Sequence, residues 1–125
     1  MGTLADRRDT HRIIVGPEFG ISFKLKGHDY QDVRITNLSP GGCFAMVGAR
    51  DARLFERGVL LENLKLMHPD LPKAPILAAV SYVLGAPSTT DPMEMVGIGI
   101  QFQGMDDVAR KALDAWVRAA NLAQD

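Results

Sequence analysis

The feature that most constrains this chain is the regular return of turn residues, which divide its apolar residues into short segments. Twelve glycines and seven prolines are spread over 125 residues, and the apolar segments between them have the length of strands. Residues 19–25 alternate well enough for one, with Phe19, Ile21, Phe23 and Leu25 on one face. The pattern predicts a β-rich fold.

Five more segments of this kind follow along the chain. The further strands are expected at residues 30–36, 43–47, 59–67, 76–84 and 96–102, with a helical turn within 48–58. Six antiparallel strands of this length suit a small closed barrel. We therefore expect a mainly β fold, with a six-stranded antiparallel β-barrel of Greek-key or split type over residues 18–102.

The period of the apolar residues changes after the last strand. One helical stripe is formed by Val108, Ala112, Ala115, Trp116, Ala119 and Leu122. Asp106 and Asp107 stand where an N-cap and the positive end of the helix dipole favour acids. The pattern predicts a C-terminal helix over residues 105–123 that packs over one opening of the barrel, with Trp116 in the core.

Length and composition set limits on function. A chain of 125 residues fits a single domain, 1–125. Its formal net charge of −1 argues against strong sequence-independent binding of nucleic acid. The lone Cys43 is expected to be a small buried strand residue, and no metal-ligand spacing or cofactor motif is found. No leader and no apolar span of about 20 residues is seen, so a cytoplasmic protein is expected.

Three arginines stand just before the first predicted strand. Arg7, Arg8 and Arg12 place three guanidinium groups within six residues. Taken alone, this spacing is more typical of a solvated basic segment than of a site.

A second polar pattern follows the second predicted strand. Asn37, Ser39 and Gly42 form N-x-S-x-x-G. By itself this pattern is typical of a hairpin turn, in which Asn and Ser side chains bond nearby backbone and Gly41 and Gly42 permit a positive φ.

The last predicted strand has one bare face. Gly97 and Gly99 alternate with Ile98, Ile100 and Phe102, so the glycine face carries no side chains there. Another group is expected to approach this face closely.

In this order and on a β-rich chain, these features resemble the PilZ domain, the bacterial receptor module for cyclic di-GMP. Residues 8–12 match the family's R-x-x-x-R stretch, and residues 37–42 match its [D/N]-x-S-x-x-G turn without a gap. Residues 97–102, followed by a helix, look like its closing strand. The resemblance covers residues 7 to about 119. Asn37 stands where many members carry Asp, although the pattern admits either.

The resemblance implies a cyclic di-GMP site, and the residue types suit that ligand. Its members are Arg7, Arg8, Arg12, Asn37, Ser39, Gly41, Gly42 and Gly99. An arginine can donate two parallel hydrogen bonds to phosphate oxygens, or to guanine O6 and N7. The Asn37 carbonyl can accept from a guanine N–H, Ser39 is a small donor and acceptor, and Gly42 lets a ligand approach the backbone.

The arginine segment has two further expectations attached to it. Residues 1–12 are expected to be flexible without ligand and to order over it. The resemblance also implies that an arginine at position 7 favours a stacked, intercalated pair of ligand molecules. The alternative is a third solvated arginine.

For function, the resemblance implies a receptor that changes conformation on binding cyclic di-GMP and regulates an effector protein. The implied outputs are motility, exopolysaccharide production, biofilm formation or virulence, through that partner or through self-association. One alternative is a PilZ-like interaction module of the type IV pilus kind, which typically lacks both motifs kept here. Another is a barrel for single-stranded nucleic acid, which would want exposed aromatics. An enzyme is not expected, because no nucleophile–base pair has recognisable spacing.

Overall fold

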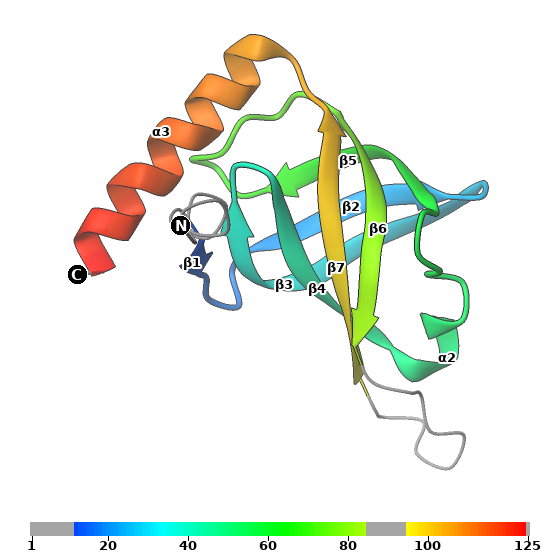
Figure 1. Ribbon diagram of the computed structural model, residues 1–125. Coiled ribbons are helices and arrows are strands. Elements are labelled where there is room, and N and C mark those ends of the chain that lie inside the picture. Colours follow the sequence, from blue (N-terminus) through cyan, green and yellow to red (C-terminus); the bar gives the residue numbers. More distant parts are fainter. Residues whose placement is uncertain (1–11, 85–94, 125) are drawn as a thin grey trace, which may run out of the picture.

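The computed structural model describes residues 12–84 and 95–124. Seven antiparallel strands and two helices follow one another along this part of the chain (Figure 1). The strands are β1 (Ile13–Ile14), β2 (Gly20–Leu25), β3 (His28–Ser39), β4 (Gly42–Gly48), β5 (Leu60–Met67), β6 (Ile76–Leu84) and β7 (Met95–Gly104). The helices are α2 (Ala49–Ala52) and α3 (Asp107–Gln124).

Six of the strands form a closed barrel. The hydrogen-bonded order runs β3-β2-β5-β6-β7-β4, and an additional β3–β4 pairing closes the ring. The six-stranded antiparallel barrel expected from the sequence is confirmed. The seventh strand, β1, lies outside the ring on the edge of β3. It was not predicted, because two residues are too few to show an alternation.

The barrel core follows the alternation read along the strands. Ile21, Phe23 and Leu25 of β2 are almost completely buried, together with Ile98 and Ile100 of β7. Side chains pointing to one face of each strand meet inside the ring and exclude water from one another. The described helices include none that is long and apolar enough to span a membrane.

The hairpin between β3 and β4 is tighter than expected. β3 continues through Ser39 and β4 begins at Gly42, so the turn contains only Pro40 and Gly41 rather than residues 37–42. Gly41 and Gly42 permit a positive φ, but neither of them adopts one. Among the described glycines only Gly27 and Gly58, in other turns, do so.

The helix α3 begins as its sequence indicates. The Asp106 carboxylate accepts the backbone N–H of Ala109 at 3.3 Å, and the Asp106 carbonyl accepts that of Arg110 at 2.8 Å. Asp106 is therefore the N-cap and leaves fewer unpaired donors in the first turn. The expected cap and the helix itself are confirmed.

The face that α3 buries differs from the expected one. Ala109, Leu113 and Val117 are buried in the core, whereas Val108 is 75% exposed and Leu122 is 74% exposed. The predicted stripe also placed Ala112, Ala115 and Ala119 on the core side, and these are exposed. The helix has two adjacent apolar faces, and the one that contains Leu113 and Val117 packs on the barrel.

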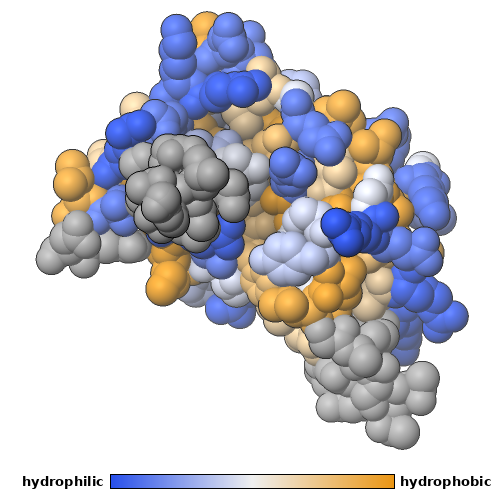
Figure 2. All heavy atoms as spheres, in the orientation of Figure 1, coloured by the Kyte–Doolittle hydropathy of each residue, from blue (hydrophilic) through white to orange (hydrophobic). Residues whose placement is uncertain are grey.

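Hydrophobic residues also remain on the barrel surface. Figure 2 shows them gathered over the lower ends of β6 and β7, where Leu84 and Met95 are each about half exposed (55% and 51%). Tyr82, two residues before Leu84 on β6, is 40% exposed.

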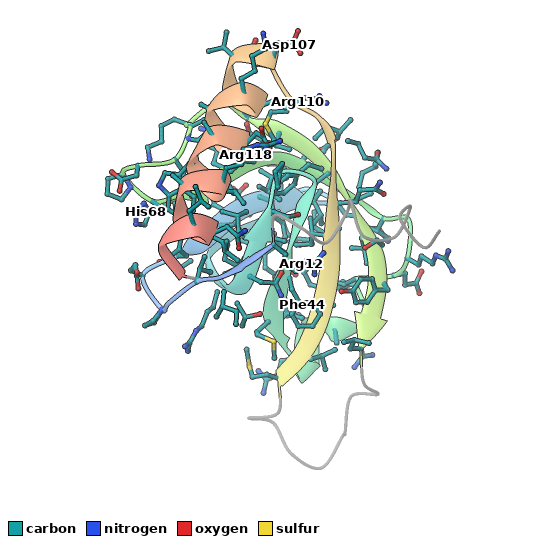
Figure 3. All side chains as sticks on the ribbon, turned by 60° about the vertical axis from the view of Figure 1, so that its left-hand side comes forward. Arg12, Phe44, His68, Asp107, Arg110 and Arg118 are labelled. Atoms are coloured by element: carbon teal, nitrogen blue, oxygen red, sulfur yellow. The ribbon has the colours of Figure 1, made fainter. Side chains whose placement is uncertain are left out.

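An aromatic cluster fastens α3 to the barrel. The Phe19 and His68 rings stack at 4.1 Å between centroids, and Trp116 lies 5.5 Å from Phe19 and 6.1 Å from His68. Figure 3 shows His68 beside the helix. Trp116 is half-buried and packs against the core, so its predicted role is confirmed.

Candidate functional site

The two polar motifs of the sequence meet where β1 lies along β3. The pairing joins Ile13 to Leu38 and Ile14 to Asn37, and the Val15 N–H donates to the Thr36 carbonyl at 3.0 Å. Because the strands are antiparallel, the residue before Ile13 lies alongside the residue after Leu38. The end of the arginine motif, Arg12, is thereby brought to Ser39.

A change of partner along β3 makes room for β1. The first part of β3 pairs with β2 as far as Arg34, whereas Asn37 and Leu38 pair with β1 on that side. On the other side, the second part of β3 pairs with β4. β3 thus supports the barrel with its first half and carries the site on its second half.

An irregularity in β3 decides which way the motif side chains point. The β3–β4 register shifts between Ile35 and Asn37, so that Ile35 and Leu38 are both buried although they are three residues apart. A strict alternation would have placed Ile35 and Asn37 on the same face. The shift instead turns Asn37 outward, onto the face of the exposed Ile14.

Asn37 carries an unsatisfied acceptor. Its Oδ1 atom is buried and has no hydrogen-bond partner among the described residues. Leaving a buried polar atom unpaired costs about 1–3 kcal/mol. An N–H group arriving here from a ligand would remove that penalty.

Ser39 already has a partner within the hairpin. Its Oγ donates to the Gly42 carbonyl at 3.2 Å, and the residue is buried. Across the same turn, the Phe102 N–H donates to the Gly41 carbonyl at 2.8 Å. The second bond holds the turn against β7, and the first closes the hairpin, so Ser39 helps to shape the candidate site.

The glycines of the turn have different surroundings. A side chain at Gly42 would collide with the Ile100 carbonyl of β7, whereas Gly41 faces open space. Gly42 was expected to let a ligand approach the backbone. The group that approaches it in the structure is the neighbouring strand.

The face above Gly97 and Gly99 is not bare. The Phe44 ring lies over Gly97 and the Tyr82 ring lies over Gly99, with no space left for a side chain at either glycine. The two rings stack with their centroids 6.1 Å apart and an interplanar angle of 29°. The expected close approach is therefore made by this outer aromatic pair, Phe44 and Tyr82.

The strand registers place the outer aromatic pair in line with Asn37. Directly opposed residues run Ile14, Asn37, Phe44, Gly99 and Tyr82 across β1, β3, β4, β7 and β6. Neighbouring strands are about 4.8 Å apart, so Gly99 lies about 10 Å from Asn37. Figure 3 shows Arg12 and Phe44 on the same side of the barrel.

The positive charge of Arg12 lies close enough to Cys43 of β4 to act on its thiol. Burial raises the pKa of the Cys43 thiol to about 12, and the Arg12 guanidinium opposes the rise. The Arg12 side chain is exposed, and neither ion pair found among the described residues includes it. Cys43 is buried, as expected, and its thiol stays protonated at neutral pH.

Two of the predicted site residues have no described position. Arg7 and Arg8 fall outside the described residues, and so does most of the segment 1–12 that was expected to be flexible. Phe44 and Tyr82 were not predicted as part of the site. The bare glycine face was the one signal for them, but only the registers show which rings cover it.

Comparisons with known proteins complete the description of the chain. No family model matches the sequence, and no curated protein does. Solved structures match its fold. K. pneumonia MrkH in its apo state superposes with a TM-score of 0.75 at 20% identity, over 90% of this chain and 49% of that chain. The Bacillus subtilis inhibitor of motility MotI/DgrA gives 0.69 at 16% identity, over 90% and 50%.

A third structure matches over most of its length. The PilZ domain of YcgR from Escherichia coli, with c-di-GMP, gives a TM-score of 0.66 at 12% identity, over 90% of both chains. The chain therefore spans about half the length of MrkH and MotI/DgrA, and nine-tenths of the YcgR domain. At identities this low, the TM-scores show a shared fold and nothing more.

Proposed function

We propose that this chain, whose fold is that of the PilZ domain, is a receptor for cyclic di-GMP. The ligand would lie over the junction of β1, β3 and β4. Arg7, Arg8 and Arg12 would hold it from one side, and Asn37 with Ser39 from the other. Gly41 completes the proposed site as a position with open space, whereas Gly42 and Gly99 shape it by letting the Ile100 carbonyl and the Tyr82 ring approach.

The observation that carries this proposal is the register of β1 on β3. It brings Arg12 to Ser39 and Asn37 although these residues are 25 or more positions apart in the sequence. A guanidinium supplies donors only, and the buried Asn37 Oδ1 supplies an unpaired acceptor. A ligand with anionic phosphates and guanine N–H groups satisfies both.

The outer aromatic pair fits the same ligand. Phe44 stands directly opposite Asn37 and stacks with Tyr82. A purine ring placed against such a surface gains about 1–3 kcal/mol from stacking. The structures of the YcgR PilZ domain and of K. pneumonia MrkH with c-di-GMP support the assignment.

The proposed role is reception of a signal rather than catalysis. Binding would change the surface presented to an effector protein or to a second copy of the chain. MrkH is described as a transcription regulatory factor and MotI/DgrA as an inhibitor of motility, which supports a regulatory output here.

Calorimetric titration of cyclic di-GMP tests the proposal. We expect the wild type to bind, and the Arg8→Ala/Arg12→Ala double variant to bind about 100-fold more weakly, because two charge-assisted pairs are lost. Arg53→Ala, which removes an exposed arginine near α2, should bind like the wild type. Two ligands per chain are expected if Arg7 supports an intercalated pair.

Four outcomes would contradict parts of this scheme. Absence of wild-type binding at tens of micromolar ligand would refute the receptor function. Full binding by the double variant would refute the site. Comparable binding of an oligonucleotide would favour the nucleic-acid alternative, and a stoichiometry of one would exclude the intercalated pair.

A further inference from the structure

Asn37 bears on which bases the proposed site accepts, an inference that rests on the proposed function. We propose that Asn37 makes the site tolerant of adenine, so that the chain also binds the mixed cyclic dinucleotide with one guanine and one adenine. Asn37 is then a specificity-determining residue as well as a ligand contact.

The surroundings of Asn37 favour a ligand that offers a hydrogen-bond donor, but they do not distinguish guanine from adenine. Its Oδ1 is buried and unpaired. The residues directly opposite it on the same face are Ile14 and Phe44, which are both apolar. No carboxylate stands at these two positions, so the Asn37 carboxamide alone would contact the polar edge of a base.

A carboxamide is compatible with the polar edge of either purine. Guanine presents N1–H and N2–H donors beside the O6 acceptor, and adenine presents an N6–H donor beside the N1 acceptor. The Asn37 Oδ1 can accept from either base, while its Nδ2–H donates to guanine O6 or adenine N1. Two hydrogen bonds form in both cases, with the carboxamide turned by about 180° between guanine and adenine, because donor and acceptor exchange places on the two bases.

A carboxylate at the same position would discriminate. It accepts both guanine donors, with the added strength of its charge. Against adenine it faces the N1 lone pair with no proton to donate, so one contact becomes repulsive. The discrimination therefore depends on whether the residue is Asn or Asp.

The other contacts limit the tolerance to one of the two bases. Stacking on Phe44 does not depend on base identity, since every base has a π-face. An arginine that forks onto guanine O6 and N7 loses that pairing with adenine, which presents an amino group in place of O6. One guanine is still needed at Arg12, so the mixed dinucleotide should bind better than cyclic di-AMP.

Equilibrium binding of three ligands to three proteins tests this inference. The ligands are cyclic di-GMP, cyclic GMP-AMP and cyclic di-AMP, and the proteins are the wild type, Asn37→Asp and Asn63→Asp. Asn63 is an exposed residue of β5, so it receives the same chemical change away from the site. For the wild type we expect cyclic GMP-AMP within about tenfold of cyclic di-GMP, and cyclic di-AMP about 100-fold weaker.

The two variants should differ in how strongly they prefer guanine to adenine. Asn37→Asp is expected to favour cyclic di-GMP over cyclic GMP-AMP by about 100-fold, whereas Asn63→Asp should behave like the wild type. If the wild type itself rejects cyclic GMP-AMP by that factor, the inference is wrong and the cyclic di-GMP receptor stands. If the wild type binds none of the three ligands, the proposed function fails with it. Should Asn37→Asp not fold, the wild-type comparison alone decides.

Discussion

At the candidate site, a single residue can lower the stability of the free protein and strengthen ligand binding. Asn37 keeps a buried oxygen unpaired, which is unfavourable in the free protein and favourable once a donor is bound. Ser39, two residues further on, is already satisfied by the Gly42 carbonyl. The unpaired atom is therefore a better indicator of a ligand than the motif pattern, which includes both residues.

Gly41 and Gly42 allow a prediction with an internal control. Gly42→Ala should lower the free energy of unfolding by about 2–3 kcal/mol, because its Cβ meets the Ile100 carbonyl and a strand must shift. Gly41→Ala has open space and should change it by less than about 0.5 kcal/mol. Urea unfolding of both variants measures the difference. Equal stability of the two would contradict the close approach of β7.

At the scale of elements, β1 joins the arginine segment to the barrel. It lies outside the closed ring and is held through β3. Its loss should therefore affect binding more than folding. The pairing continues beyond the strand in the bond from Val15 to Thr36.

Substitution of Val15 tests this separation. Val15→Pro removes the donor of that bond, and it should weaken cyclic di-GMP binding about tenfold while lowering stability by about 1 kcal/mol. Val15→Ala keeps the donor and is the control for the lost side chain. Titration and urea unfolding of both variants give the two quantities. Unchanged binding by Val15→Pro would show that β1 does not position the arginines.

The helix α3 shows how an element can mislead a pattern-based prediction. Both of its apolar faces have helical spacing, and the exposed one runs from Val108 to Leu122. The face that packs on the barrel contains Leu113 and Val117 and adjoins Trp116. Which face packs depends on the shape of the barrel surface, and the helix sequence holds no information about that shape.

At the scale of the whole molecule, the buried thiol links folding to pH. The pKa of Cys43 is raised from 9.0 to about 12 by burial. Above pH 9 the unfolded chain loses this proton while the folded chain keeps it. Stability from this group is therefore complete below about pH 9 and is lost as the pH rises towards 12.

Urea unfolding at pH 8 and pH 10 measures this linkage. The wild type should lose about 1.4 kcal/mol through Cys43 by pH 10, since one pKa unit corresponds to about 1.4 kcal/mol. Cys43→Ala should lose correspondingly less between the same two pH values. The pKa of Tyr30 is also raised by burial and by Asp51, and both proteins share that contribution. Equal losses in the two proteins would show that the thiol is not protected by the fold.

Much of the barrel could be predicted from the sequence, because the alternation of residues along a strand indicates which side chains are buried. The segments at residues 59–67 and 76–84 closely match β5 and β6, since turn residues mark their ends. The candidate site was harder to predict from the sequence. The shift at residue 36 and the rings over Gly97 and Gly99 involve residues on different strands, and no local pattern contains them.

The sequence by itself determined the β-rich chain, the final helix and the two motifs with suitable chemistry. Alternation, capping and residue type are properties of neighbouring residues, so they can be read without a fold. Only the tertiary structure decided that Arg12 lies beside Ser39, that Asn37 turns outward, and that Phe44 stands next to it. These facts depend on strand register, which is set by packing across the whole barrel.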